Sequence, residues 1–128
     1  MFSHVMLGVK DVARATDFYD GLMTLLGHRS YIREEGWAAW RPADSDRPLV
    51  IVSKPFDGGP ASPGNGQMLA FNAASRALVD SAHGYALSHG GKDEGAPGPR
   101  PQYHPDYYGA YFRDPDGNKL CVVCHEAG

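Results

Sequence analysis

Apolar residues alternate with other residues at the start of the chain and predict a strand over residues 2–10, with His4 on its second face. Helical spacing of apolar residues begins directly afterwards. Asp11 is a residue type that caps helix N-termini, and Gly27 can end the helix in the left-handed conformation. The first part of the chain is therefore predicted to form a strand followed by an amphipathic helix.

The same order recurs in the second half of the chain. Met68 to Ala73 is predicted as a strand, Ser75 is an N-cap candidate, and apolar residues at helical spacing continue to Gly90. The sequences of the first strands of the two halves can be aligned so that their inward-facing and outward-facing positions match, although few residues are identical. This repetition indicates a diverged duplication.

Further strands are predicted after each helix. Residues 31–40 and 49–53 are rich in aromatic and β-branched residues and favour two or three antiparallel strands. Residues 109–125 predict a hairpin around the turn Asp114 to Asn118, where proline and glycine favour the reversal. Residues 92–105 are rich in glycine and proline and are predicted to form a loop.

These elements predict an α+β protein of two βαβββ modules that form a half-open mixed barrel with a concave, pocket-bearing face. We expect one domain over residues 1–128. Module one covers about residues 1–56, a proline- and glycine-rich linker covers about residues 57–66, and module two covers about residues 67–128.

Composition and charge narrow the expected partners. The 128 residues are 42% hydrophobic, which supports a packed core. The net charge of −3 and the scattered lysines and arginines argue against nucleic acid. No apolar run reaches transmembrane length and the first residues lack a signal-peptide pattern. We therefore expect a cytoplasmic protein that binds neither nucleic acid nor membrane.

Several motifs, in order along nearly the whole chain, resemble the glyoxalase/bleomycin-resistance/extradiol-dioxygenase superfamily, which has the vicinal oxygen chelate fold. They are His4 to Asp11, Phe18-Tyr19, Leu26-Gly27, Leu69 to Phe71, and Tyr111 to Asn118. The resemblance implies this fold and a small-molecule pocket. It does not choose a reaction, because the superfamily includes metal-dependent isomerases and lyases, dioxygenases, thiol transferases and metal-free drug-binding proteins.

The resemblance also implies four positions for the ligands of a divalent metal. His4 matches the first position, but the others fall on Val52 or Ser53, on Met68 and on Cys121. Thioether and thiol side chains suit soft ions or, for thiolate, zinc. His4 and Cys121 remain metal candidates, and the alternative is that these side chains only line an apolar pocket. A divalent metal cofactor is left open, because the usual ligand set is incomplete.

No catalytic residue is assigned, but polar and aromatic residues near the predicted hairpin are pocket candidates. Arg100 could bind an anionic group, and a tyrosine or His104 could exchange a proton. Such residues could equally bond loop carbonyls at the rim of a sheet. The full set of pocket candidates is His4, Trp37, Met68, Arg100, Tyr103, His104, Tyr108 and Cys121.

Two further sequence features concern the cysteines and the tryptophans. Cys121, Cys124 and His125 match the C-x-x-C-H pattern of haem attachment and the C-x-x-C of dithiol sites, but two cysteines three apart on a strand point to opposite faces. Trp37 and Trp40 have the same spacing, so we expect one to reach the pocket and the other the core.

The leading hypothesis is a protein that binds, and could transform, a small organic compound without the usual complete metal site. The alternative is a metal-dependent lyase, isomerase or dioxygenase that uses a non-standard ligand set. A structural or partner-binding module is the third hypothesis. We expect a homodimer, because a second copy can cover open sheets.

Overall fold

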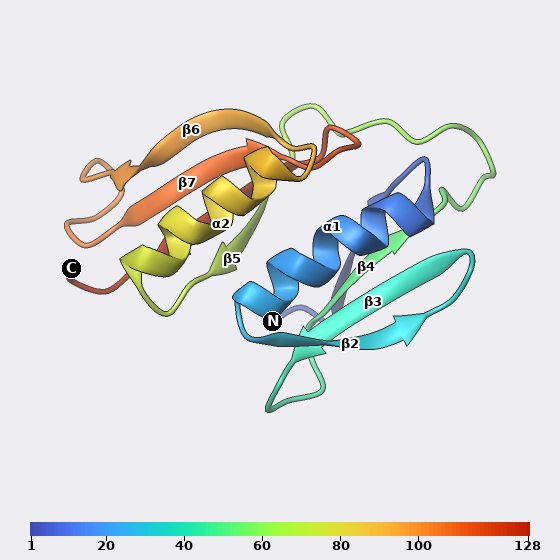
Figure 1. The fold of residues 1–128 in the computed structure, drawn as a ribbon, viewed down its shortest axis with the longest axis horizontal. Helices are drawn as coiled ribbons and strands as arrows, with labels where there is room; N and C mark the ends of the chain where they lie inside the picture. Colours follow the sequence, from blue (N-terminus) through green and yellow to red (C-terminus); the bar gives the residue numbers. More distant parts are fainter.

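The computed structural model describes all 128 residues and contains two helices and eight strands (Figure 1). In chain order these are β1 His4–Gly8, α1 Val12–Leu25, β2 His28–Arg33, β3 Trp37–Pro42, β4 Leu49–Ser53, β5 Leu69–Asn72, α2 Arg76–Ser88, β6 Lys92–Pro99, β7 Tyr108–Arg113 and β8 Lys119–Cys124. Neither helix is long and apolar enough to span a membrane.

The strands form two four-stranded sheets, ordered β1-β4-β3-β2 and β5-β8-β7-β6. In each sheet the parallel pair is formed by the strands that come first and fourth in the sequence, which are β1 with β4 and β5 with β8. The remaining pairs are antiparallel. The prediction of two βαβββ modules is therefore confirmed. Figure 1 shows the two helices side by side in front of the sheets.

The ends of both helices follow the chemistry expected from the sequence. The carboxylate of Asp11 and the hydroxyl of Ser75 each accept a hydrogen bond from a backbone N–H three residues further on. Gly27 and Gly90 follow the helices with φ values of 89° and 91°, which lie in the left-handed region that favours glycine. Local sequence thus defines where each helix begins and ends.

The prediction of a loop over residues 92–105 is wrong for its first part, because Lys92–Pro99 forms strand β6. This strand lies at the edge of its sheet and pairs only with β7. Prolines such as Pro97 and Pro99 are tolerated on an edge strand, where one side needs no hydrogen bonds. The register shifts around Gly95 also adapt the strand to its unusual composition.

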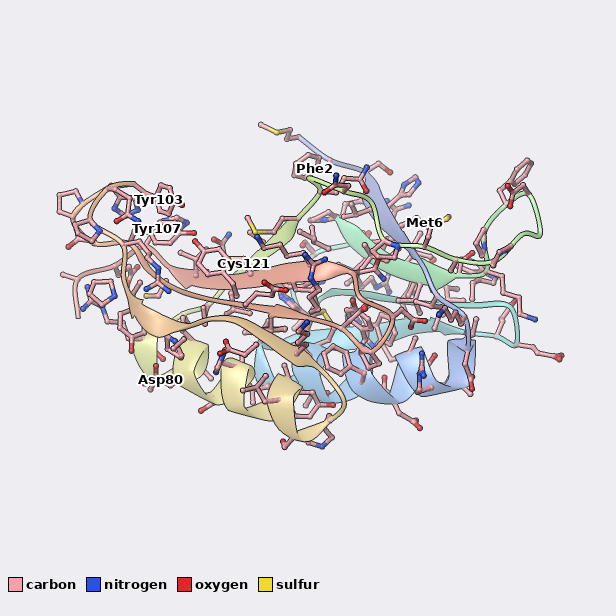
Figure 2. The ribbon with its side chains drawn as sticks, turned by 90° about the horizontal axis from the view of Figure 1, so that it is seen from above. Phe2, Met6, Asp80, Tyr103, Tyr107 and Cys121 are labelled. Atoms are coloured by element: carbon pink, nitrogen blue, oxygen red, sulfur yellow. The ribbon has the colours of Figure 1, made fainter.

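One hydrophobic core spans both modules between the helices and the sheets. Its largest fully buried side chains include Trp40, Tyr19, Phe112 and Leu22. We call the opposite side of both sheets, away from the helices, the open face. Figure 2 shows Phe2, Met6, Tyr103, Tyr107 and Cys121 on this side.

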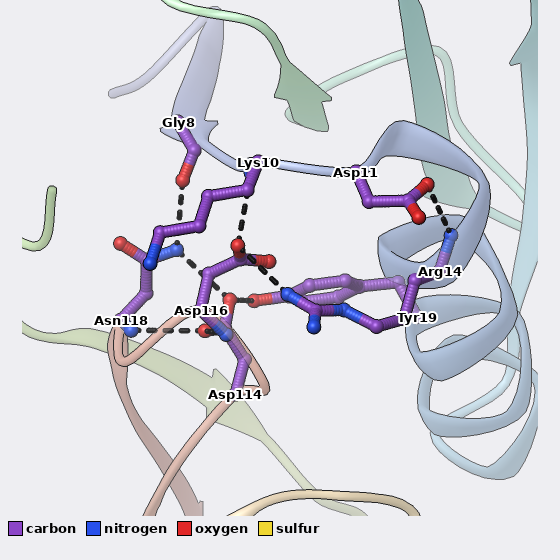
Figure 3. Close-up of polar contacts among 8 residues, drawn as sticks. All are labelled: Gly8, Lys10, Asp11, Arg14, Tyr19, Asp114, Asp116 and Asn118. Atoms are coloured by element: carbon purple, nitrogen blue, oxygen red, sulfur yellow. Dashed lines mark hydrogen bonds and ion pairs between the residues drawn. The ribbon is translucent and has the colours of Figure 1, made fainter. Parts of the chain in front are cut away.

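The turn between β7 and β8 connects module two to module one (Figure 3). The Tyr19 hydroxyl on α1 donates a 2.6 Å hydrogen bond to Asp114 Oδ2, and both side chains are buried. Asn118 Nδ2 lies 2.9 Å from Asp114 Oδ2 and 3.1 Å from the carbonyl oxygen of Gly8, and can donate to both. Sequence analysis assigned Asp114 only to the turn, whereas the structure makes it the centre of the module junction.

Candidate functional site

Two phenols and a thiol meet on the open face of the second sheet. Cys121 on β8 lies opposite Tyr111 on β7, so their side chains share one face. Tyr107 approaches from the segment before β7. Its hydroxyl oxygen lies 2.8 Å from that of Tyr111 and 3.6 Å from Cys121 Sγ. We call Tyr107, Tyr111 and Cys121 the phenol–thiol cluster.

Two glycines allow the tyrosine rings to lie close to the sheet. A Cβ atom added to Gly109 would lie 2.9 Å from Tyr107 Cε1, and one added to Gly95 would lie 3.1 Å from Tyr111 Cδ1. Side chains at these positions would displace the rings. The glycines of this segment therefore help to position the phenol–thiol cluster.

All three groups of the phenol–thiol cluster hold their protons at neutral pH. Burial raises the pKa of Tyr107, of Tyr111 and of the Cys121 thiol above their ordinary values. Cys121 is fully buried, whereas the two tyrosines are partly exposed. The site therefore presents neutral phenol hydrogen-bond donors in front of an inaccessible thiol.

Two cations lie beside the same cluster. The Arg100 guanidinium and the Lys119 ammonium lie 5.6 Å and 5.9 Å from the centre of the Tyr111 ring. Arg100 also donates hydrogen bonds to the carbonyl oxygens of Ala96 and Pro99, at 2.8 Å and 3.3 Å. Arg100 thus bonds loop carbonyls and at the same time places positive charge beside the phenols.

A histidine pair borders the cluster. The Asp106 N–H donates to His104 Nδ1 at 3.2 Å, which assigns the proton of a neutral His104 to Nε2. His104 Nε2 then donates to His125 Nδ1 at 2.8 Å. Both imidazole rings pack edge-on against Tyr107. The pair therefore supports Tyr107 and leaves the second ring nitrogen of His125 as a donor.

The remaining predicted pocket residues are spread over the molecule. His4 and Met68 are exposed, and Trp37 is exposed on the face opposite the buried Trp40. Tyr103 packs against Tyr107 at the edge of the cluster.

Tyr108 lies on the helix side of the second sheet, away from the phenol–thiol cluster. It pairs with the core residue Cys124, and its hydroxyl donates to Asp80 of α2 at 2.7 Å. The two cysteines accordingly lie on opposite faces of β8, and both are free thiols.

The four positions implied for a divalent metal do not fit one in this chain. Val52 is buried in the core, and the Ser53 hydroxyl bonds the carbonyl of Lys54. Cys121 is a buried, protonated thiol, and Met68 offers only a thioether. The chain contains no group of three or more His, Cys, Asp or Glu that could hold a metal ion. His4 alone has the expected ligand type.

The sequence analysis assigned no role to Tyr111, and it included neither Tyr107 nor His125 among the pocket candidates. Alternation along β7 and β8 could have placed Tyr111 beside Cys121, because residues opposite each other in a hairpin share a face. The contact between His104 and His125 joins a loop to the end of β8 and leaves no signal in the sequence.

Paired βαβββ sheets with helices on one side and an open face on the other define a protein of the glyoxalase class. The sequence model of the Glyoxalase/Bleomycin resistance protein/Dioxygenase superfamily matches residues 1–122. The chain belongs to this superfamily. A search of curated proteins found no match.

Solved structures agree with this assignment. A glyoxalase/bleomycin resistance protein from Albidiferax ferrireducens T118 is 37% identical, with a TM-score of 0.86 over 98% of this chain and 99% of that one. A family enzyme from Burkholderia phytofirmans PsJN is 19% identical, with a TM-score of 0.74 over 97% and 98% of the two chains. Lactoylglutathione lyase from Agrobacterium tumefaciens is 20% identical, with a TM-score of 0.66 over 97% and 92%. The latter two show the fold alone.

Proposed function

We propose that this protein binds a small organic molecule on its open face and does so without the usual metal site of its superfamily. The observation that carries the proposal is the phenol–thiol cluster, in which two partly exposed phenols lie 2.8 Å apart and retain their protons. Neutral donors beside positive charge suit an electron-rich oxygen, such as a carbonyl or a phenol.

The surroundings of the cluster favour binding over nucleophilic chemistry. A thiol acts as a nucleophile in its thiolate form, and burial disfavours that form at Cys121. Arg100 and Lys119 add positive charge beside the ring of Tyr111 and favour partial negative charge on a bound oxygen. One of the two phenol protons lies in the hydrogen bond between the hydroxyls, so the other is free to donate to the ligand oxygen. A ligand oxygen that replaced the bond between the phenols would accept from both Tyr107 and Tyr111.

A thermal-shift screen of glutathione adducts, catechols and antibiotics tests the proposal. A compound that raises the melting temperature of the wild-type protein should bind about fivefold more weakly to Tyr107→Phe and Tyr111→Phe, because each variant loses one donor of about 1 kcal/mol and keeps its ring. Tyr103→Phe is the matched control, since Tyr103 is largely exposed. Equal affinities in all three variants would contradict binding at the cluster.

We also propose that a second copy of the chain covers the part of the open face around β1, β3 and the start of β5, and not the phenol–thiol cluster on β7 and β8. Met6 and Met68 are 56% and 47% exposed, and Trp37 is exposed on the same side. Apolar side chains exposed on one side of the molecule favour burial against a partner. An isologous dimer would bury the same surface on both copies.

Sedimentation velocity tests the dimer. Wild-type protein should sediment as a dimer, and Met6→Glu combined with Met68→Glu should give a monomer, because burying two unpaired carboxylates is costly. Leu87→Glu is the control, since Leu87 is similarly exposed but lies on α2. A wild-type monomer, or a dimer lost only in Leu87→Glu, would overturn the proposal.

Two expectations from the sequence remain proposals. One is that residues 1–128 form a single domain, supported by a core shared between the modules about 1–56 and 67–128 across the linker about 57–66. The other is a cytoplasmic location.

A further inference from the structure

We propose that the cavity between the two modules is a second binding site, which takes a small aromatic carboxylate. The cavity has a volume of about 340 Å³, within the range of about 300–1,000 Å³ typical of ligand pockets. Its lining excludes the phenol–thiol cluster and all eight pocket candidates derived from the sequence. It is therefore a different site from the one proposed above.

Apolar and aromatic side chains form most of this cavity. Trp40 and Met23 from module one and Phe71 from module two are buried and line it. Phe2 and Asn72 are exposed and lie at its mouth. Two aromatic rings in the wall favour a ligand with an aromatic body, since aromatic pairs contribute beyond their buried area.

The cavity exists because the two sheets are not paired with each other. No Cα atom of β1 lies within 8 Å of a Cα atom of β5, whereas paired strands lie about 4.8 Å apart. Ala73 N–H donates to Val123 of β8, and backbone groups alternate along a strand. The N–H groups of Ala70 and Asn72 therefore point away from β8, toward the cavity, and can donate to a ligand oxygen.

Charge at the cavity selects an anion. Arg41 is the one permanently charged residue in the lining, which contains no Asp or Glu. Its Nη1 pairs with Asp46 Oδ1 at 3.3 Å, but the Asp46 side chain is 80% exposed, and such pairs are weak. The guanidinium also stacks on the Tyr31 ring, 4.0 Å from its centre, and its Nε is buried without a hydrogen-bond partner. A ligand carboxylate could replace Asp46 and accept hydrogen bonds from the guanidinium.

The test uses 4-tert-butylbenzoate and its neutral analogue 4-tert-butylbenzamide as probes. Trp40 lines the cavity and Trp37 does not, so the Trp37→Phe variant reports binding through Trp40 fluorescence alone. Calorimetry measures the affinity in parallel. The benzoate should bind and change the Trp40 emission, and the benzamide should bind about tenfold more weakly, because it lacks the charge.

Variants locate the probe. Arg41→Gln should weaken benzoate binding about tenfold, and Ala70→Leu should weaken it by narrowing the mouth. Arg29→Gln is the matched control, because Arg29 lies opposite Arg41 on β2 but outside the cavity lining. Circular dichroism checks that each variant is folded.

Three outcomes would overturn the proposal. One is the absence of benzoate binding at millimolar concentration, and another is equal affinity for benzoate and benzamide. The third is loss of binding in Tyr107→Phe with full binding in Arg41→Gln and Ala70→Leu, which would assign the probe to the open face.

Discussion

The chemistry of Cys121 depends on its surroundings more than on its residue type. The thiol is fully buried, its pKa is raised by that burial, and the Tyr107 hydroxyl lies 3.6 Å from its sulfur. In an accessible site beside the same cations, a cysteine would be a nucleophile or a metal ligand. Here the thiol is buried and protonated, and it lies beneath two phenols.

We therefore expect Cys121 to react slowly with thiol reagents. In the Cys124→Ser variant, which leaves one thiol, Ellman's reagent at pH 8 should label native protein at least about tenfold more slowly than unfolded protein, because burial limits both access and thiolate. Absorbance over time measures the rate. Equally fast labelling in both states would mean that the thiol is accessible, and the metal-ligand hypothesis for Cys121 would regain support.

At the scale of elements, a hydrogen bond between side chains connects α2 to strand β6. His83 on α2 lies 2.9 Å from Asp93 Oδ1 on β6, and the N–H of Gly95 donates to the same oxygen at 2.9 Å. The His83 side chain is nearly buried and packs near the ring of Phe112. These contacts hold a proline-containing edge strand against its helix.

The hydrogen bond from His83 lowers the pKa of Asp93, and the Gly95 N–H lowers it further. Because this folded-state pKa lies below the ordinary value of 3.8, the carboxylate stabilises the protein above that pH. The contribution is lost as the pH falls through the folded-state pKa. In His83→Leu, the pKa of Asp93 should rise toward 3.8.

A carboxyl NMR titration measures this change. Glu94 is an internal control, because its pKa is lowered by Arg113 and should be the same in both proteins. An unchanged Asp93 pKa in the variant would show that the contact with His83 does not form in solution.

At the scale of the whole molecule, the β7–β8 turn holds the modules together. The carboxylate of Asp114 accepts hydrogen bonds from Tyr19 of module one and from the backbone and side chain of Asn118. Because Asp114 is buried, the loss of any of these donors would lower the stability of the folded protein. The relative placement of the modules, and with it the cavity between them, depends on this cluster.

Tyr19→Phe should lower the free energy of unfolding by about 1–3 kcal/mol, because the buried carboxylate loses a donor. Burial and the neighbouring Asp114 raise the pKa of Tyr19 above 10.0 in the folded state. That contribution to stability is complete below pH 10 and is lost as the pH rises through the folded-state pKa. Wild-type protein should therefore lose more stability than Tyr19→Phe above pH 10.

Urea unfolding at pH 8 and above pH 10 measures both effects. Tyr103→Phe is the control, since this exposed residue should change neither value. Equal stability of Tyr19→Phe and wild-type protein at pH 8 would mean that the hydrogen bond to Asp114 contributes nothing net.

The sequence by itself determined most of the elements and their order. Alternating or helical spacing, the caps Asp11 and Ser75 and the turn at Asp114 are local signals, because they depend on neighbouring residues. The duplication could be inferred because the same order of signals occurs in both halves of the chain. Residues 92–99 were misread as a loop because glycine and proline favour loops locally, and only pairing with β7 makes this segment an edge strand.

The tertiary structure alone decided which side chains meet. Tyr107 contacts Cys121, and His104 contacts His125, because loop geometry and strand register bring together residues far apart in sequence. The cavity beside Arg41 likewise depends on the angle and spacing of two sheets that share no hydrogen bonds. No periodicity along one chain encodes such distances, which result from packing of the whole core.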